Sequence, residues 1–222
     1  LGVSLADYDG VAMTGSALNI YDRSPVIERQ MALVAQVFEL GLPFFGSCWG
    51  LQVAVTVAGG EVSRHSHGRE FGFARRIHQT PLGSSHPMFA GKPLVFEAPT
   101  VHLDHVTRLP PQAMVLALNE HSIQAISFQV KKSAVWGVQY HPEYTFADIA
   151  AVARRYGQRL IDDATFESEA SMLNFIDDCE RLMHEPGNPS LQFKHGLGSA
   201  MINSRERLAE LQNWLSSIKL PR

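Results

Sequence analysis

The sequence predicts an α/β protein with a mostly parallel sheet, an antiparallel extension and a helical C-terminal appendage. Three observations predict this fold class. Short apolar runs alternate with helical patterns up to residue 60, strand-like segments fill the middle of the chain, and apolar residues three and four apart dominate after Pro142. The chain has 222 residues, of which 45% are hydrophobic and 18% charged, so it can form one large domain or one domain with an appendage.

The first sixty residues are expected to form a strand, a helix, a second strand and a second helix. Ser24 followed by Pro25 is typical of a helix start, and Gly41 is typical of a helix end. A strand and helix that alternate in this way indicate parallel strands joined by crossover helices. The expected strands span residues 9–15 and 42–46, and the expected helices span residues 25–40 and 49–58.

The rest of the chain divides into a strand-rich middle and a helical tail. The middle segments are separated by Gly, Pro, Asn, Ser and Lys, which favours antiparallel hairpins added to the sheet. We expect the main domain to span residues 1–150 and a helical extension packed on it to span residues 151–222, with a linker at residues 185–190. The expected strands are residues 61–66, 71–79, 94–102, 113–119, 123–130 and 133–141, and the expected helices are residues 145–161, 166–184 and 204–220.

Charge and cysteine content exclude several classes of function. The net charge of −3 and scattered basic residues do not favour a nucleic-acid partner. Cys48 and Cys179 lie far apart in unlike contexts, so a disulfide is not expected and a reducing, cytoplasmic compartment is. No apolar run reaches the roughly 18 residues of a membrane span, and no signal peptide is visible. Because the chain opens at Leu1, we expect its natural N-terminus to be absent.

Cys48 lies at the junction of an expected buried strand and an expected helix. Gly46 and Gly50 flank it at two residues on either side, where a larger side chain would crowd a sharp strand-to-helix turn. A helix N-terminus beyond such a turn stabilises a thiolate. The local pattern therefore indicates either a nucleophile or a small, packed thiol at a glycine turn.

A nucleophilic cysteine requires a histidine base, and His141 is the candidate that stands apart from the other nine histidines. It ends an expected strand and is followed by Pro142 and Glu143, so both polar side chains can leave the sheet at the same edge. An ordinary strand end remains the alternative interpretation. The histidines of residues 65–67 and 102–105 do not match a zinc spacing, and no phosphate-binding or dinucleotide fingerprint is present, so neither a metal nor a cofactor is expected.

Together these segments resemble the class I, or triad, glutamine amidotransferases, and most closely their stand-alone branch that is similar to GMP synthase. Four segments match in family order over some two thirds of the chain. The strand end matches the family's His-x-Glu, and the elbow its G-x-C-x-G-x-Q. The matching segments read YDGVAMTGS, GSCWGLQ, HLDHVTRLP and GVQYHPE. The resemblance implies a flavodoxin-like, doubly wound sheet, and that family has a strand, a helix and a further strand before the segment at residues 9–15.

The resemblance also implies hydrolysis of L-glutamine to glutamate and ammonia. Cys48 would form a γ-glutamyl thioester, His141 would transfer protons, and Glu143 would orient His141. The ammonia would pass to an unknown acceptor, for which a separate synthetase protein is a candidate, and a homodimer is a candidate assembly. The family pattern places the oxyanion hole at Gly15, Ser16 and Trp49, and the substrate contacts at Gln52, Leu103, Asp104 and Glu70, the last with a structural or substrate-shaping role.

Two alternatives remain on the same residues. One is a γ-glutamyl hydrolase that cleaves a γ-linked polyamine or folate-like compound with the same fold and triad. The other is a non-enzymatic sensor or binding module. The segments GSCWGLQ and HLDHV argue against the hydrolase, and the joint presence of Cys48, His141 and Glu143 argues against the binding module.

Overall fold

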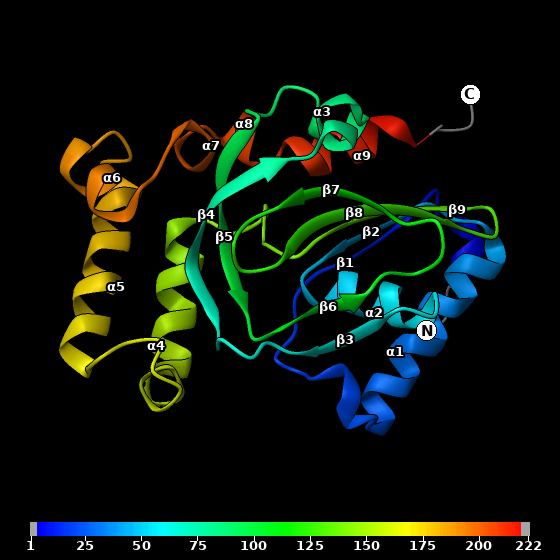
Figure 1. The fold of residues 1–222 in the computed structure, drawn as a ribbon, viewed down its shortest axis with the longest axis horizontal. Coiled ribbons are helices and arrows are strands. Elements are labelled where there is room, and N and C mark those ends of the chain that lie inside the picture. The colour runs from blue at the N-terminus through cyan, green and yellow to red at the C-terminus, as the bar shows by residue number, and fades with distance from the viewer. Residues whose placement is uncertain (1–3, 219–222) are drawn as a thin grey trace.

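A computed structural model describes residues 4–218, and its sheet begins with parallel strands (Figure 1). The N-terminal half forms the strand, helix, strand and helix that the sequence predicts. Strand β1 pairs with β2, and β2 with β9, both in parallel. These elements are β1 (Val11–Met13), α1 (Pro25–Leu40), β2 (Phe44–Ser47), α2 (Trp49–Val57) and β9 (Ser133–Val138).

The remaining strands continue the same sheet in antiparallel pairs. The strand order is β1-β2-β9-β8-β7-β4-β5, and every pair from β9 to β5 is antiparallel. Two of the six pairs in this sheet are therefore parallel and four are antiparallel. The predicted flavodoxin-like α/β fold with an antiparallel extension is confirmed. The added strands are β4 (Glu70–Gln79), β5 (Val95–His102), β7 (Met114–Leu118) and β8 (Ile123–Val130).

The segment at residues 61–66 does not join this sheet, contrary to the expectation for the middle of the chain. Its strand β3 (Glu61–Arg64) pairs with β6 (Asp104–Arg108) in a separate two-stranded sheet. Only Leu103 separates β6 from β5, so the chain turns away from the main sheet at that residue. The pairing of Val62 with Val106 explains the arrangement, because both side chains pack on the core around α2.

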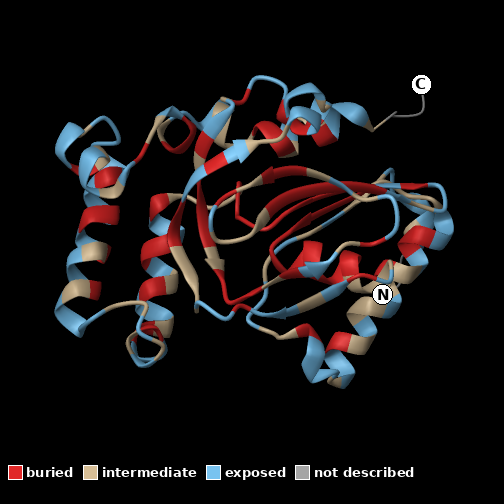
Figure 2. Ribbon diagram, in the orientation of Figure 1, coloured by how far each residue is buried: buried red, intermediate tan, exposed pale blue. Residues whose placement is uncertain are grey.

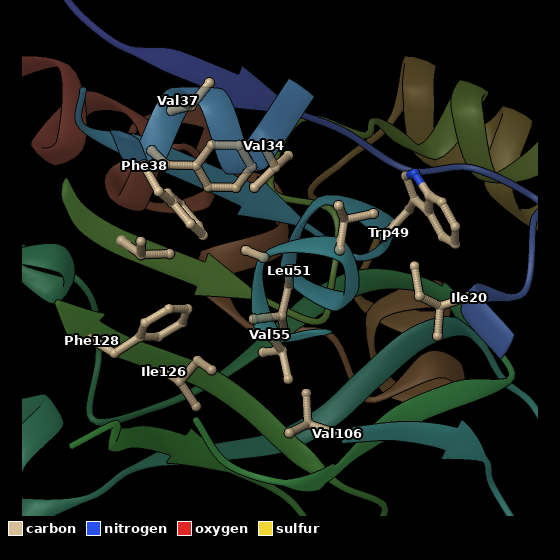
Figure 3. Close-up of a cluster of buried hydrophobic side chains, with 14 of the residues drawn as sticks. Ile20, Val34, Val37, Phe38, Trp49, Leu51, Val55, Val106, Ile126 and Phe128 are labelled. Carbon is tan, nitrogen blue, oxygen red and sulfur yellow. The ribbon is translucent and has the colours of Figure 1, made fainter. Parts of the chain in front are cut away.

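Helices cover both faces of the main sheet, as a doubly wound fold requires. Leu51 and Val55 of α2 lie in the core on one face, between Phe38 of α1 and Ile126 of β8 (Figure 3). On the other face, the ring of Phe45 lies 5.8 Å from that of Trp214 in α9 (Ala209–Ser217). Buried residues are concentrated on the central strands and the inner faces of the helices (Figure 2).

The helical tail begins with two long helices at one end of the sheet, beside β4 and β5 (Figure 1). The helix expected at residues 204–220 is interrupted at Leu208, and residues 219 and 220 lie outside the described residues. The expected linker at residues 185–190 ends inside a short helix that Asn188 caps. The tail helices are α4 (Phe146–Asp162), α5 (Glu169–His184), α6 (Pro189–His195), α7 (Ser199–Ile202), α8 (Ser204–Arg207) and α9.

A buried ion pair attaches the end of the tail to the sheet. Lys92 Nζ lies 2.6 Å from Glu210 Oε1 of α9, and both side chains are almost completely buried. The hydroxyl of Tyr140 donates to the same carboxylate. Between residues 4 and 218, no helix is both long and apolar enough to cross a membrane.

Candidate active site

Cys48 lies on a sharp turn between β2 and α2. Its backbone has φ 49° and ψ −103°, a conformation that non-glycine residues rarely adopt and that costs about 1–3 kcal/mol. The Cys48 amide donates to the carbonyl of Val138 at 2.8 Å, which holds the turn against β9. The thiol is 5% exposed, and its sulfur lies 3.6 Å from the carbonyl oxygen of Val101. The turn thus presents the sulfur to a cavity that Cys48 lines.

The two flanking glycines are required by close backbone contacts. A Cβ atom on Gly46 would lie 2.5 Å from the carbonyl carbon of Gly50. A Cβ atom on Gly50 would lie 2.0 Å from the carbonyl oxygen of Met13 in β1. Any side chain at either position would therefore push the helix away from the strands, and this explains the G-x-C-x-G spacing.

His141 and Glu143 follow β9 and meet beside the Cys48 turn. The His141 amide donates to the carbonyl of Pro99 at 2.8 Å, and its Nδ1 lies 2.9 Å from Glu143 Oε1. Because Nδ1 donates to this carboxylate, Nε2 is the ring nitrogen that remains for chemistry. Ser47 also donates to Glu143 Oε1, at 2.9 Å. Ser47 was not among the predicted site residues, although its position next to Cys48 at the end of a buried strand indicates that it lies beside the nucleophile.

The surroundings of His141 favour its protonated form. Burial lowers its pKa, but the charge of the Cys48 thiolate, a hydrogen bond with that sulfur and the hydrogen bond and charge of Glu143 together raise the pKa to about 10. The ring of Tyr144 stacks on His141 with centroids 4.1 Å apart. Burial, with the charges of Glu143 and Cys48, raises the pKa of Tyr144 to about 12, so this phenol stays neutral. The imidazole is therefore fixed on two sides and can donate a proton.

The residues expected to form an oxyanion hole lie around the same sulfur. Gly15 and Ser16 line the cavity together with Cys48. A Cβ atom on Gly15 would lie 2.5 Å from Cε1 of His141, so only glycine allows the imidazole its position. Trp49 opens α2, where the first backbone N–H groups lack partners within the helix. Its indole is buried and donates to Gln30 at 2.7 Å.

Gln52, Leu103 and Asp104 form a second part of the cavity wall. The Gln52 amide donates to the backbone carbonyl of Asp104 at 3.1 Å, which connects α2 to the start of β6. The Asp104 carboxylate accepts from the hydroxyl of Tyr21 at 3.1 Å. Burial raises the pKa of Asp104, whereas the hydrogen bond from Tyr21 opposes this rise. These three predicted substrate contacts are thus brought together in one place.

Glu70 lies behind this wall, within a buried hydrogen-bond network. Its Oε2 lies 2.8 Å from His102 Nε2 and accepts from Gln124 at 2.9 Å, and its Oε1 accepts from Asn119 at 2.6 Å. Burial would raise the pKa of Glu70, but these hydrogen bonds and the charge of His102 lower it to about 2. His102 Nδ1 lies 3.0 Å from the carbonyl of Asp104. Since both ring nitrogens face acceptors, His102 satisfies its partners fully only as an imidazolium.

The cavity extends beyond these residues to helix α4. Its volume is about 460 Å³. One face of α4 lines it, with residues three and four positions apart. Residues from 151 onwards were expected in a helical appendage and were not predicted to line the site, because an amphipathic pattern does not indicate which surface a helix packs on. The lining residues of α4 are Val152, Arg155, Tyr156, Arg159 and Leu160.

The histidine-rich segments form a cluster without a metal-binding arrangement. His65 Nδ1 accepts from the amide of His67 at 3.0 Å, and its Nε2 lies 2.8 Å from the carbonyl of His121. Both ring nitrogens of His65 are therefore already in use. Over residues 4–218, no three His, Cys, Asp or Glu side chains are placed to hold a metal ion.

Comparisons with known proteins identify the family of this chain. The sequence model of the family described as glutamine amidotransferase class-I matches residues 3–151. A γ-glutamyl-L-1-hydroxyisopropylamide hydrolase from a Pseudomonas species is 36% identical over 98% of this chain and 75% of its own length. A glutamine-hydrolyzing GMP synthase from Exiguobacterium sibiricum is 30% identical over 84% of this chain, but the match spans only 35% of that protein.

Solved structures share the fold at lower identity. A glutamine amidotransferase from Thermotoga maritima matches with a TM-score of 0.64 and 20% identity, over 98% of this chain and 81% of that one. Another, from Methylobacillus flagellatus, matches with a TM-score of 0.63 and 19% identity, over 100% of this chain and 82% of that one. The family match covers most of the chain and includes the turn at Cys48, the segment with His141 after β9, and the loop at Gly15. The chain therefore belongs to the class I glutamine amidotransferase family.

Proposed function

We propose that this chain hydrolyses γ-glutamyl amides through Cys48, with L-glutamine as the simplest substrate. The observation that carries the proposal is the strained turn of Cys48, which directs the sulfur into the cavity that His141 also lines. A turn that costs folding free energy is expected to persist where the position of its side chain matters. A binding module without turnover would need neither this turn nor the pairing of His141 with Glu143 at 2.9 Å.

The reaction proceeds in two steps. The Cys48 thiol gives its proton to His141, and the sulfur attacks the γ-carbonyl carbon. The carbonyl electrons move to the oxygen, where N–H groups of Gly15 or Ser16 and of Trp49 stabilise the negative charge. The carbon–nitrogen bond then breaks, and His141 gives its proton to the departing amine, or to ammonia when the substrate is glutamine. A water molecule that loses a proton to His141 attacks the thioester. The carbon–sulfur bond breaks, glutamate leaves, and His141 passes the proton from water to the sulfur, which restores the thiol of Cys48.

The remaining predicted residues support the substrate and the base. Glu143 orients the imidazole and stabilises its charge, and Ser47 holds the carboxylate of Glu143. Gln52 and the backbone at Leu103 and Asp104 contact the amino-acid half of the substrate. Glu70 acts through His102. The Glu70 carboxylate binds one ring nitrogen of His102, and the other ring nitrogen holds the backbone carbonyl of Asp104.

The fate of the ammonia belongs to the same proposal. The GMP synthase from Spiroplasma kunkelii is named as glutamine-hydrolyzing, and this chain matches only 27% of its length. If L-glutamine is the substrate, a separate synthetase is a candidate acceptor of the ammonia.

A second candidate is a substituted γ-glutamyl amide, which releases a larger amine by the same steps. The relative from Pseudomonas is named for such a compound, and the match covers nearly all of this chain. A cavity that continues from the sulfur to α4 also provides room for an amine half larger than ammonia. Both candidates share the thioester and differ only in the leaving group.

The test combines turnover with labelling. Purified protein is incubated with L-glutamine and with γ-glutamyl-L-1-hydroxyisopropylamide, and glutamate release is measured for the wild type and for Cys48→Ala. We expect release by the wild type alone, and covalent labelling of Cys48 by a glutamine-like electrophile such as a diazoketone. Binding of glutamine without glutamate release or labelling would identify a binding module and reject the proposal.

A further inference from the structure

Helix α4 contributes two arginines to the wall of the cavity that contains Cys48. Arg155 and Arg159 lie one helical turn apart on the face that lines the cavity, and both are exposed. Their neighbours along the helix and across the cavity are paired: Arg154 forms an ion pair with Glu180, and Arg69 with Asp163. In the part of the chain that the structure describes, neither Arg155 nor Arg159 has a carboxylate partner.

The positive charges of Arg155 and Arg159 are not balanced by a nearby carboxylate among the described residues. Two like charges four residues apart on a helix repel each other, so the pair opposes the helix unless an anion lies between the side chains. Of the other ionisable groups that line the cavity, Arg69 is paired with Asp163, His102 with Glu70 and His141 with Glu143, which leaves Asp104 as the one carboxylate of the lining itself between residues 4 and 218. Asp104 already accepts a hydrogen bond from Tyr21, and it is buried in the β6 part of the wall. The cavity thus carries an excess of positive charge that a bound anion would balance.

The position of α4 indicates which half of a substrate this anion belongs to. In the proposed reaction the departing amine receives its proton from His141 and therefore lies beside that ring. Tyr144 stacks on His141 and leads directly into α4, where Tyr156 and Arg155 continue the wall. The amino-acid half lies instead against Gln52 and the β5–β6 corner. The guanidinium of Arg155 also lies 5.5 Å from the ring of Tyr156, which keeps it near the helix surface.

We propose that Arg155 and Arg159 bind a carboxylate on the amine half of the substrate, so that the preferred substrates are γ-glutamyl amides of amino acids. This inference rests on the proposed γ-glutamyl amide hydrolysis and specifies its substrate class. Arginine pairs bind carboxylates through paired N–H donors, whereas a neutral amine half would leave both guanidinium groups without a partner.

The test uses two probes that differ only in one charge. Values of kcat/KM are measured for γ-glutamylglycine and for γ-glutamylglycinamide, with L-glutamine as a reference. We expect the wild type to prefer the carboxylate by about tenfold, the effect of about 1.4 kcal/mol. Because the arginines are exposed, the preference should decrease as ionic strength rises.

Substitutions then assign the preference to residues. The double variant Arg155→Gln with Arg159→Gln should reduce the ratio of the two kcat/KM values to about one. The matched control is Arg154→Gln, which removes an exposed arginine of the same helix that does not line the cavity, and it should keep the wild-type ratio.

Other results would reject either the role of the two arginines or the proposed function itself. A wild-type ratio near one rejects the inference, while hydrolysis of both probes keeps the proposed function. An equal loss for both probes in the double variant means that the arginines bind the glutamyl half, which also rejects it. If neither probe nor glutamine is hydrolysed and Cys48 is not labelled, the proposed function itself fails.

Discussion

Replacing Glu70 by glutamine tests the buried network that supports the β5–β6 corner. Four side chains donate to this carboxylate: His102, Asn119 and Gln124 at 2.6–2.9 Å, and the hydroxyl of Thr100 at 3.5 Å. A glutamine side chain has one acceptor oxygen and one donor nitrogen, so at least one of these donors would face another donor. We expect Glu70→Gln to destabilise the fold substantially at neutral pH and to loosen the corner that holds the Asp104 carbonyl.

The pKa of Glu70 gives the part of the folding free energy that depends on the charge of this carboxylate. Its pKa is about 2 in the folded protein, against an ordinary value of 4.5. A difference of roughly 2.5 between these values corresponds to about 3 kcal/mol of folding free energy, since one pKa unit is worth about 1.4 kcal/mol. Because the folded value is the lower one, this stabilisation is present above pH 4.5 and is lost as the pH falls towards 2. About 1.4 kcal/mol of it should already be lost at pH 3.5.

Urea unfolding at pH 7 and pH 3.5 measures how much ionised Glu70 contributes to the folding free energy. The free energy of unfolding of the wild type should exceed that of Glu70→Gln by about 3 kcal/mol or more at pH 7, and the gap should narrow by about 1.4 kcal/mol at pH 3.5. Glu120→Gln is the control, because Glu120 is exposed and lies next to Asn119 in the chain. A gap that stays constant between the two pH values would refute the assignment of a charged, buried Glu70.

Two further substitutions test the site and the attachment of the tail. Gly15→Ala should lower kcat/KM for a γ-glutamyl amide by about 10²-fold, because its Cβ would lie 2.5 Å from an imidazole carbon and displace that ring by nearly 1 Å. Gly187→Ala, where a Cβ meets nothing within 4 Å, should leave activity unchanged, and equal activity of both variants contradicts the geometry. Lys92→Met should reduce the free energy of unfolding by about 3–5 kcal/mol, since it leaves a buried carboxylate without its cation. An unchanged melting temperature in calorimetry would show that the pair contributes nothing.

The sequence was sufficient to predict the elements that hold Cys48 and His141. Glycines at fixed spacing around a cysteine have a local physical cause, because the contacts that exclude a Cβ at Gly46 and Gly50 come from the same turn and the strand beside it. The strand before Pro142 was also predicted, since proline lacks the N–H that a strand requires, although β9 ends at Val138 and not at the expected residue 141. Local steric rules therefore account for this part of the site.

Other features depend on contacts between segments far apart in the sequence. The pairing of β3 with β6 follows from packing on α2, which no periodicity reveals. Glu70 has an ordinary position at the start of a strand in the sequence, and only the fold brings four side-chain donors to its carboxylate. The cavity face of α4 has ordinary amphipathic spacing, and only the fold places Arg155 beside a site whose residues outside α4 come from the first 150.

The antiparallel extension is part of the site rather than an addition to it. β2 and β9 are parallel neighbours with Ser47 opposite Val138, so Cys48 and His141 both leave the sheet at the carboxyl ends of these strands. β5 lies at the far end of the strand order, yet its backbone carbonyls at Pro99 and Val101 accept from the His141 amide and the Cys48 thiol. These two contacts require the sheet to curl until its last strand meets its centre. The four antiparallel pairs from β9 to β5 supply that curl, and they bring the wall at Leu103 and Asp104 to the sulfur.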